Sequence, residues 1–298
     1  MIILASVLLA ACIIVTAILV SVNIKKNSLP DTAVDDIIAL LEDSGIDIDR
    51  ELIPKNTRTG KVYIFGTDDY GVTVSSLLTG ESVKSRYAVP GGEIITTDGG
   101  KLLELGDDFS FRYSSDGAKK DTPDTDSLED VSGTISDAYR KKIVSEAVGF
   151  LDSGSADFDL SGKITALTEV VKICSNGGKY YAVCSRKIDG VEVADNVAVC
   201  TLEDGQVTYA EGRWCFLSGG EEYSAQLSDI LNILFNVSSE IKPEEGRRAR
   251  ITSVGMCYSL YYYGGGEKFC LIPCRQITTE NDGDYIFSSL DGTLYTKK

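Results

Sequence analysis

The residue types that usually perform catalysis are unevenly represented in this chain, and one of them is missing altogether. The 298 residues include 8 cysteines, 45 aspartates and glutamates, and no histidine. Ser-His-Asp and Cys-His nucleophilic sites, histidine-ligated zinc sites and HExxH proteases all need an imidazole, which is also the usual general base near neutral pH. The sequence therefore leaves carboxylate chemistry, serine–lysine chemistry or no chemistry.

Serine–lysine chemistry has one match. Ser239 and Lys242 have the Ser-x-x-Lys spacing of penicillin-recognising enzymes, but neither Ser-Asp-Asn nor Lys-Thr-Gly follows, and that assignment needs both. We interpret the match as chance. Asp157-Phe158-Asp159 lacks the spacing, glycine and closing glutamate of a calcium loop, and Gly264-Gly265-Gly266 is not followed by the Lys-Ser/Thr of a phosphate loop.

Adjacent carboxylates occur at five places: Asp35-Asp36, Asp68-Asp69, Asp107-Asp108, Glu221-Glu222 and Glu244-Glu245. A glycosidase needs two carboxylates across a cleft and neighbours that raise the pKa of one, which adjacency in the sequence does not provide. We interpret the pairs as solvated loop charges and keep a cell-wall glycosidase only as a disfavoured alternative. The sequence thus predicts no enzyme: no catalytic, cofactor-binding or metal-ligating residue, and no cofactor.

The cysteines indicate neither a disulfide framework nor a zinc site. They are Cys12, Cys174, Cys184, Cys200, Cys215, Cys257, Cys270 and Cys274. Seven lie beyond the apolar leader, an odd number, and no CxxC pair occurs, whereas disulfide scaffolds and structural zinc sites favour even counts or paired spacing. We predict buried thiols on strand faces, because free cysteine packs as a small apolar residue.

Two aromatic groups are the candidate partner-contact residues. Tyr261, Tyr262 and Tyr263 stand beside a glycine turn, and Trp214 and Phe216 follow an arginine. Interfaces are enriched in Tyr and Trp, so each group is a candidate exposed contact patch. The alternative left open is a strand end whose alternate rings pack inward.

The charge balance excludes some partner classes. The chain has 29 Lys and Arg against 45 Asp and Glu, a formal charge of −16. Nucleic acids and anionic lipid headgroups are bound mainly by clustered Lys and Arg. We therefore expect no nucleic-acid partner.

The first residues form an apolar leader. Ile2 to Val22 is an uncharged run, close to the roughly 20 residues that a membrane-spanning helix needs. A retained transmembrane anchor is the preferred interpretation; a cleaved signal peptide and a lipoprotein signal ending at Cys12 are the alternatives. Lys25 and Lys26 would place the C-terminal part in the cytoplasm, but long domains are translocated largely regardless of charge. We expect a single-pass protein of the cell membrane with an extracytoplasmic C-terminal domain.

The sequence predicts the α+β fold class. It divides into a transmembrane anchor (1–24), an N-terminal α+β subdomain (29–115), a linker (116–131) and two helix–sheet repeats (132–215 and 219–298). In the subdomain, a helix from Asp31 ends near Gly45, and short β-rich runs from Lys61 to Tyr113 form a small meander, with Val72-Thr73-Val74 as one strand.

The two repeats are predicted from a common offset of 87 residues. The helix 136–150 corresponds to 223–237, and its stripe Ile143, Val144, Ala147 and Val148 corresponds to Ile230, Leu231, Leu234 and Phe235. The hairpin turns Gly177-Gly178 and Asp204-Gly205 correspond to Gly264-Gly265 and Asp291-Gly292. Each unit is expected to be one helix packed on an antiparallel sheet.

Taken together, these features resemble a bacterial regulatory family. An apolar leader precedes 40–48 (LLEDSGIDI) and 51–54 (ELIP), and the later segments 271–277 (LIPCRQI) and 284–292 (DYIFSSLDG) are the most characteristic. The chain resembles the YycI/YycH family, YycI more closely, and its repeats look PepSY-like. Gln276 stands where the family has an aromatic or arginine, and Ser288-Ser289 where it has Asn-Ala.

The resemblance implies a membrane protein of Gram-positive bacteria that regulates by contact. Its expected partners are a WalK-type sensor histidine kinase, whose control of cell-wall homeostasis it modulates, and a YycH-like sister protein. No catalytic residue carries over, because the family has none. The alternative is a lipoprotein or PepSY-like module that binds a protease or a cell-wall polymer.

Overall fold

The computed structural model describes residues 29–54, 59–66, 70–118, 122–154, 166–216, 220–243, 246–263, 268–281 and 283–297. The predicted anchor (1–24) and the aspartates of 157–159 lie outside these ranges. Within them, no helix combines the length and the apolar character that a membrane span requires.

Strands dominate the described part of the chain, which contains fifteen of them and four α-helices. The helices are α2 (Asp31–Asp43), α3 (Tyr70–Thr79), α4 (Asp137–Ser153) and α5 (Ile230–Glu240), with a 3-10 turn η1 (Arg50–Leu52). The strands are β1 (Ile46–Ile48), β2 (Thr59–Gly66), β3 (Val83–Val89), β4 (Gly92–Thr97), β5 (Leu102–Gly106), β6 (Ser110–Ser114), β7 (Ala166–Asn176), β8 (Lys179–Ile188), β9 (Val191–Glu203), β10 (Gln206–Arg213), β11 (Glu221–Gln226), β12 (Ala249–Tyr263), β13 (Lys268–Thr279), β14 (Gly283–Ser288) and β15 (Leu294–Lys297).

The predicted α+β class is therefore wrong, and the protein is mostly β. Its strand pairs are mixed, since β1·β12 and β12·β9 are parallel while most others are antiparallel. The chain does not form the two predicted copies of one helix packed on its own antiparallel sheet. At the offset of 87 residues, β11 lies where the helix of the second copy was expected to start.

The chain divides into two compact units. Unit 1 comprises 1–61, 224–256 and 273–298, and unit 2 comprises 62–223 and 257–272. Both β12 and β13 contribute residues to each unit. The predicted boundaries at 115, 131 and 215 stay predictions.

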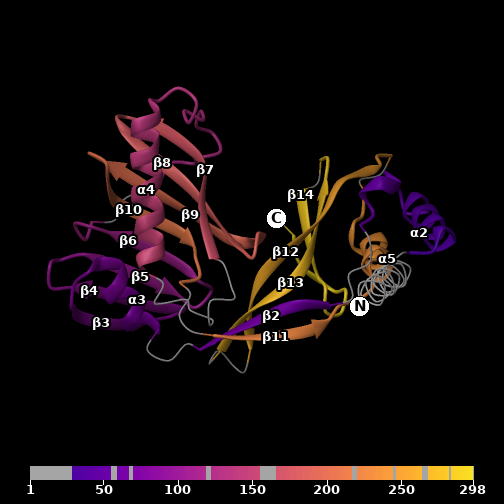
Figure 1. Ribbon diagram of the computed structural model, residues 1–298, viewed down its shortest axis with the longest axis horizontal. Coiled ribbons are helices and arrows are strands. Elements are labelled where there is room, and N and C mark those ends of the chain that lie inside the picture. Colours follow the sequence, from indigo (N-terminus) through magenta and orange to yellow (C-terminus); the bar gives the residue numbers. More distant parts are fainter. Residues whose placement is uncertain are drawn as a thin grey trace, which may run out of the picture. The chain divides into compact units, whose positions relative to one another are not determined.

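Unit 2 contains an eight-stranded antiparallel sheet in the order β7-β8-β9-β10-β6-β5-β4-β3. Figure 1 shows α4 running along one face of this sheet. Because side chains alternate between the two faces of a strand, only every second residue of each strand meets the helix. A core of buried aliphatic, aromatic and cysteine side chains fills this contact.

Local sequence explains why α4 forms where it does. The hydroxyl of Ser136 caps the helix by accepting a hydrogen bond from the backbone N–H of Tyr139, 3.4 Å away. Ile143, Ala147 and Leu151 recur every four residues and are fully buried. This stripe is the amphipathic pattern that packs a helix on a sheet.

One predicted strand is a helix. Val72-Thr73-Val74 was expected to extend the meander because β-branched residues favour strands, but it lies within α3. Val74 and Leu78, four residues apart, are both buried in the same core as α4. Burial of one helical face thus outweighs the local strand preference.

Unit 1 is built around α2, α5 and short strands. The prediction for α2 is confirmed, including its end before Gly45, which has φ +80°. For α5, Ile230 and Leu234 are buried as predicted, but Phe235 is 56% exposed and Ile233 and Val237 take the inner positions. The helix begins at Ile230, capped by the Asp229 carboxylate.

The hairpin turns of unit 2 agree with the sequence. Gly177 and Gly178 join β7 to β8, and Asp204 and Gly205 join β9 to β10, all four with positive φ. The turn at 264–265 lies outside the described residues. The seven cysteines beyond the leader are buried and free, as predicted, and all but Cys215, which follows β10, lie on strands. Burial raises the pKa of Cys270 to about 11.

The β4 strand offers a test of this sheet. Gly92 has φ +157°, and an added Cβ would lie 2.1 Å from the carbonyl oxygen of Leu105 on β5, whereas at Gly91, with φ +80°, a Cβ would meet nothing within 4 Å. We expect Gly92→Ala to lower the free energy of unfolding by about 2–4 kcal/mol and Gly91→Ala by about 1–2 kcal/mol. Urea unfolding followed by the fluorescence of Trp214, the single tryptophan and buried in unit 2, measures both. Equal losses would contradict the close approach of β4 and β5.

Candidate functional site

The surface of unit 2 opposite α3 and α4 is the candidate site, and we call it the second face. Ala182 and Cys184 of β8 pack toward α4, so the alternate residues Tyr181, Val183 and Ser185 point to the second face. The strand register determines which residues are neighbours on the second face, and it pairs Ser185 with Val197 of β9. The second face therefore carries one side chain in two from all eight strands.

Charged residues on the second face are paired across strands. Arg112 of β6 lies between two carboxylates, with Nη1 2.9 Å from Glu104 Oε2 of β5 and Nε 3.2 Å from Glu211 Oε2 of β10. The hydroxyl of Tyr209 donates to the same Glu211 oxygen at 2.9 Å. Burial, and then this hydrogen bond, raise the pKa of Tyr209 above its ordinary value. Cross-strand pairs of this kind stabilise register more than they create reactivity.

A pocket of about 360 Å³ opens beside this charged row. Its walls include Val89, Ile94, Glu104 and Arg112, from β3 to β6. Its three charged residues are already engaged, since Glu104 pairs with Arg112 and the third, Glu93, pairs with Arg86. A polar ligand entering there would have to compete with those ion pairs.

The other end of the sheet is apolar. Leu167 and Val171 of β7 are 49% and 57% exposed, and Val197 of β9 is 41% exposed. We call these three residues the β7 patch. Lys187 and Glu169 form an ion pair of 2.6 Å among them, and Val171 occupies a bulge opposite β8. Leu167 and Val171 lie on one strand, and Val197 lies on β9, two strands away. Exposed aliphatic side chains that form a contiguous patch are typical of contact surfaces.

The edge of β7 is covered over only part of its length. The segment predicted as a linker crosses it: Val131 N–H donates to the carbonyl of Ile173 at 2.8 Å, and Lys172 Nζ donates to the carbonyl of Thr125 at 2.6 Å. Along 166–171, no strand in the described ranges pairs with the outer side of β7. Within the described ranges, the outer backbone groups of 166–171, beside the β7 patch, therefore have no strand partner.

A buried arginine fixes α4 above the β7 end of the sheet. Arg186 of β8 is 2% exposed; its Nη2 lies 3.1 Å from Asp152 Oδ1 of α4, and its Nη1 donates to the carbonyl of Cys215 at 2.9 Å. The Thr168 hydroxyl of β7 donates to the same Asp152 oxygen at 2.6 Å. The guanidinium also stacks 4.6 Å from the centroid of the Trp214 ring.

This packing locates the aromatic residues singled out in the sequence. Trp214 and Phe216 are 1% and 0% exposed and belong to the core under α4, where Phe216 meets Phe111 edge to face. Neither ring reaches the surface. Tyr261 of β12 is 46% exposed, whereas the side chains of Tyr262 and Tyr263 lie outside the described part.

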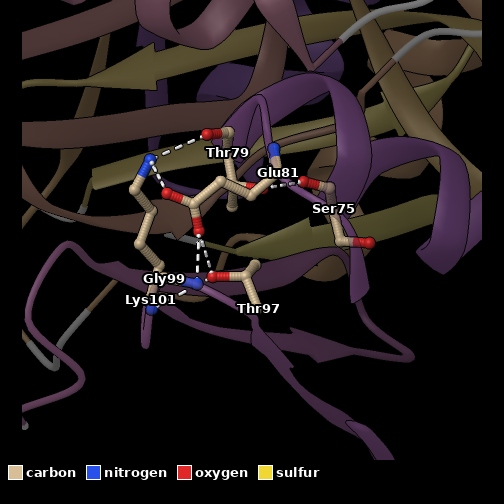
Figure 2. A network of polar contacts seen from close by, with 6 residues as sticks. All are labelled: Ser75, Thr79, Glu81, Thr97, Gly99 and Lys101. Atoms are coloured by element: carbon tan, nitrogen blue, oxygen red, sulfur yellow. Dashed lines mark hydrogen bonds and ion pairs between the residues drawn. The ribbon is translucent and has the colours of Figure 1, made fainter. Parts of the chain in front are cut away.

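A second polar cluster fastens the end of α3 to the turn between β4 and β5. Figure 2 shows the Glu81 carboxylate at its centre, accepting from the hydroxyl of Thr97 at 2.5 Å, the N–H of Gly99 at 3.1 Å and Nζ of Lys101 at 3.0 Å. The same ammonium donates to the carbonyl of Thr79, the last residue of α3, at 2.8 Å. Every oxygen of Glu81 is thus used to hold the chain together.

The remaining sequence motifs have structural roles where they are described. The hydroxyl of Ser239 donates to the carbonyl of Asn236 at 2.8 Å within α5. Asp108 accepts from the N–H and hydroxyl of Ser110 in a turn. In the described ranges, no group of three or more Cys, Asp or Glu residues is placed to hold a metal ion.

The β7 patch was missed because sequence does not reveal which strand is an edge. The segment 167–171 (LTEVV) could be read from the sequence as a strand. The apolar Leu167 on its outer face was the signal that could have indicated an exposed patch.

Comparisons with known proteins identify no family for this chain. No protein-family model matches the chain, and no curated protein matches it. Among solved structures it is similar to an uncharacterized protein from Eubacterium rectale ATCC 33656, with 10% sequence identity, 89% of this chain and 99% of that chain covered, and a TM-score of 0.43.

The Glu81 cluster predicts a pH-dependent contribution to stability. Hydrogen bonds, first of all that from Thr97, hold the pKa of Glu81 below its ordinary value of 4.5. A depressed carboxylate pKa stabilises the fold above the unfolded pKa, and this contribution is lost as the pH falls through the folded pKa. We expect Glu81→Gln to lower the urea midpoint of Trp214 fluorescence at pH 7, and the gap from wild type to close progressively below about pH 4.5.

The matched control is Glu146→Gln, which removes an exposed carboxylate of α4. Its urea midpoint should equal that of wild type at pH 7 and at pH 3. A gap between wild type and Glu81→Gln that stayed constant from pH 7 to pH 3 would contradict the electrostatic role of Glu81.

Proposed function

We propose that this protein is a non-enzymatic regulator that acts by binding another protein, with the β7 patch and the open part of the β7 edge as its contact surface. The observation that supports this proposal is the coincidence of two features on one strand: unpaired backbone along 166–171 and exposed Leu167 and Val171. Within the described ranges, 166–171 has no strand partner on its outer side.

Such an edge is chemically suited to a partner strand. An extended peptide that adds to a sheet edge gains main-chain hydrogen bonds, while alternate side chains give specificity. Proteins that do not use an exposed edge in this way usually protect it with charges, proline or a covering segment. Here the segment around Thr125 and Val131 covers β7 at Lys172 and Ile173. Among the described strands, none pairs with the outer side of 166–171.

The polar clusters support the same proposal because their charged groups already have partners within the fold. Glu81, Arg112 and Arg186 each have several partners that belong to the fold. A charged group that holds two or three elements together is ill suited to change its protonation or partners during a reaction cycle. The exposed aliphatic residues of the β7 patch are available for recognition.

The partner we propose is a sensor histidine kinase of the cell envelope. The support is the resemblance of 271–277 and 284–292 to the regulatory family described above. Regulation by contact needs only that the protein binds two states of the kinase with different affinity. A YycH-like sister protein is the second expected partner.

The contact surface is tested by Leu167→Lys combined with Val171→Lys in the full-length protein. Both side chains are about half exposed, so the fold should lose no more than about 0.5 kcal/mol, whereas lysine on an edge strand opposes strand addition. We expect crosslinked pull-down from membranes to recover the kinase at least ~10-fold less well, equivalent to about 1.4 kcal/mol.

Leu290→Lys is the control, because Leu290 is 38% exposed on a turn of unit 1. It should recover as much kinase as wild type, and all variants should unfold at the wild-type urea midpoint. Undiminished kinase recovery by the double variant would remove the β7 surface from the proposal. Absence of a kinase from the wild-type pull-down would remove the proposed partner.

A further inference from the structure

Unit 2 has a further pocket, of about 410 Å³, on the side of its sheet that α4 covers. One wall is a flank of α4 with Glu146, Gly149 and Phe150, and the residues that face it include Tyr113 of β6 and Gln206 of β10. We call this hollow the α4 pocket. All of its described lining residues belong to unit 2, and its volume lies in the range of small-molecule sites.

Tyr113 brings to the α4 pocket a buried hydroxyl that the fold does not use. The residue is 4% exposed, and its ring packs against Phe150 with the two ring centroids 4.8 Å apart. No described residue forms a hydrogen bond with its hydroxyl. Burial, and then the negative charge of Glu81, raise the pKa of Tyr113 above its ordinary value, so the phenol stays protonated at neutral pH and can both donate and accept. A buried polar group without a partner costs free energy, and a ligand in the pocket would supply that partner.

Three other polar side chains of the α4 pocket are uncommitted as well. Ser115 follows β6, Ser145 lies on α4, and Gln206 begins β10. None of these side chains has a hydrogen-bond partner among the described residues. A hydroxyl and a carboxamide each offer both a donor and an acceptor, so the three groups share the two-way hydrogen-bonding character of Tyr113.

The charges around the α4 pocket do not select an ion. Lys101 Nζ lies 3.0 Å from Glu81 Oε1 and donates to the carbonyl of Thr79 at 2.8 Å (Figure 2), so its charge is balanced within the fold. Glu146 forms no ion pair with a described residue, but it is exposed on α4, where salt and water screen its charge. The pocket is therefore suited to a neutral ligand that both donates and accepts hydrogen bonds.

We propose that the α4 pocket binds a sugar. Each hydroxyl of a sugar both donates and accepts a hydrogen bond, which matches Tyr113, the two serines and Gln206. The C–H bonds of a sugar ring form an apolar surface that packs against aromatic side chains, and Tyr113 and Phe150 supply two rings. Glu146 adds an exposed acceptor. Sugar binding here would be independent of the β7 patch, which lies on the second face.

Gly149 offers a way to fill the α4 pocket without disturbing the core. It lies on the flank of α4 that lines the pocket, and a Cβ added to it would meet nothing within 4 Å. In Gly149→Leu the larger side chain takes up part of the pocket. Leucine also has the higher helix propensity, so the urea midpoint of this variant should not fall below that of wild type.

The test titrates glucose, ribose, N-acetylglucosamine and glucosamine into the full chain in a polyoxyethylene detergent, which contains no sugar, and follows binding by saturation-transfer difference NMR. Wild type should bind at least one of the three neutral sugars with a Kd below ~10 mM. This Kd should be the same at about 0.02 M and about 0.5 M salt, because a neutral ligand is not screened. The Kd should rise at least ~3-fold in Tyr113→Phe, which loses only the hydroxyl, and at least ~10-fold in Gly149→Leu.

The matched control is Tyr139→Phe, which removes the hydroxyl of a tyrosine that lies on α4 but does not line the pocket. Its Kd should stay within about 2-fold of wild type. Both phenylalanine variants should keep the wild-type urea midpoint, because neither hydroxyl has a hydrogen-bond partner among the described residues.

Three results would overturn the proposal. The first is the absence of saturable binding of any of the neutral sugars by wild type up to ~50 mM. The second is an equal loss of affinity in Tyr113→Phe and Tyr139→Phe, which would place the sugar outside the α4 pocket. The third is binding of glucosamine alone that weakens with added salt, which would assign the pocket to a small cation held by Glu146.

Discussion

The arrangement of unit 2 depends on the different side-chain periods of a helix and of the sheet that it covers. Side chains of a strand alternate between its two faces, and those of a helix repeat every 3.6 residues. The buried stripe of α4, Ile143, Ala147 and Leu151, therefore contacts only every second side chain of the strands that it covers. The other side chains of those strands need a different solution. Some form ion pairs, as Arg112 does with Glu104 and Glu211, and some stay exposed, as in the β7 patch. The surface proposed for binding is thus a direct consequence of how the core is covered.

Arg186 shows how this arrangement tolerates a charge in its interior. An isolated buried guanidinium is strongly unfavourable, and here the carboxylate of Asp152, the carbonyl of Cys215 and the ring of Trp214 surround it. Asp152 is half exposed, so the ion pair keeps contact with solvent and avoids part of the desolvation cost of a fully buried pair. Since these partners come from α4 and from the chain after β10, the arginine joins elements that are distant in sequence.

Sequence predicted the features that depend on neighbouring residues and failed where distant ones decide. Helix α2 with its end at Gly45, the turns at 177–178 and 204–205, and the buried cysteines all follow from local patterns. Val72–Val74 was assigned to the wrong element because burial of one helical face overrides the local strand propensity. The residues before Ile230 were also misassigned, since 221–226 form the largely exposed strand β11. The candidate sites were harder to predict from the sequence than the helices and turns. Trp214 was predicted to be a surface anchor, but it is buried, with the Arg186 guanidinium over its ring.

The division of unit 1 into three segments has a consequence for the order in which the nascent chain acquires structure. Asp47 and Arg248, whose side chains are joined within this unit, are 201 residues apart. At the usual ribosomal speed of 5–20 residues per second, α2 and β1 emerge on the order of 10–40 s before the residues that bury them. Most of unit 2 is continuous from Val62 to Tyr223 and is synthesised during that interval. The first segment therefore exposes Ile37 and Leu41 throughout this delay, and a chaperone that shields amphipathic helices during biogenesis would act on it first.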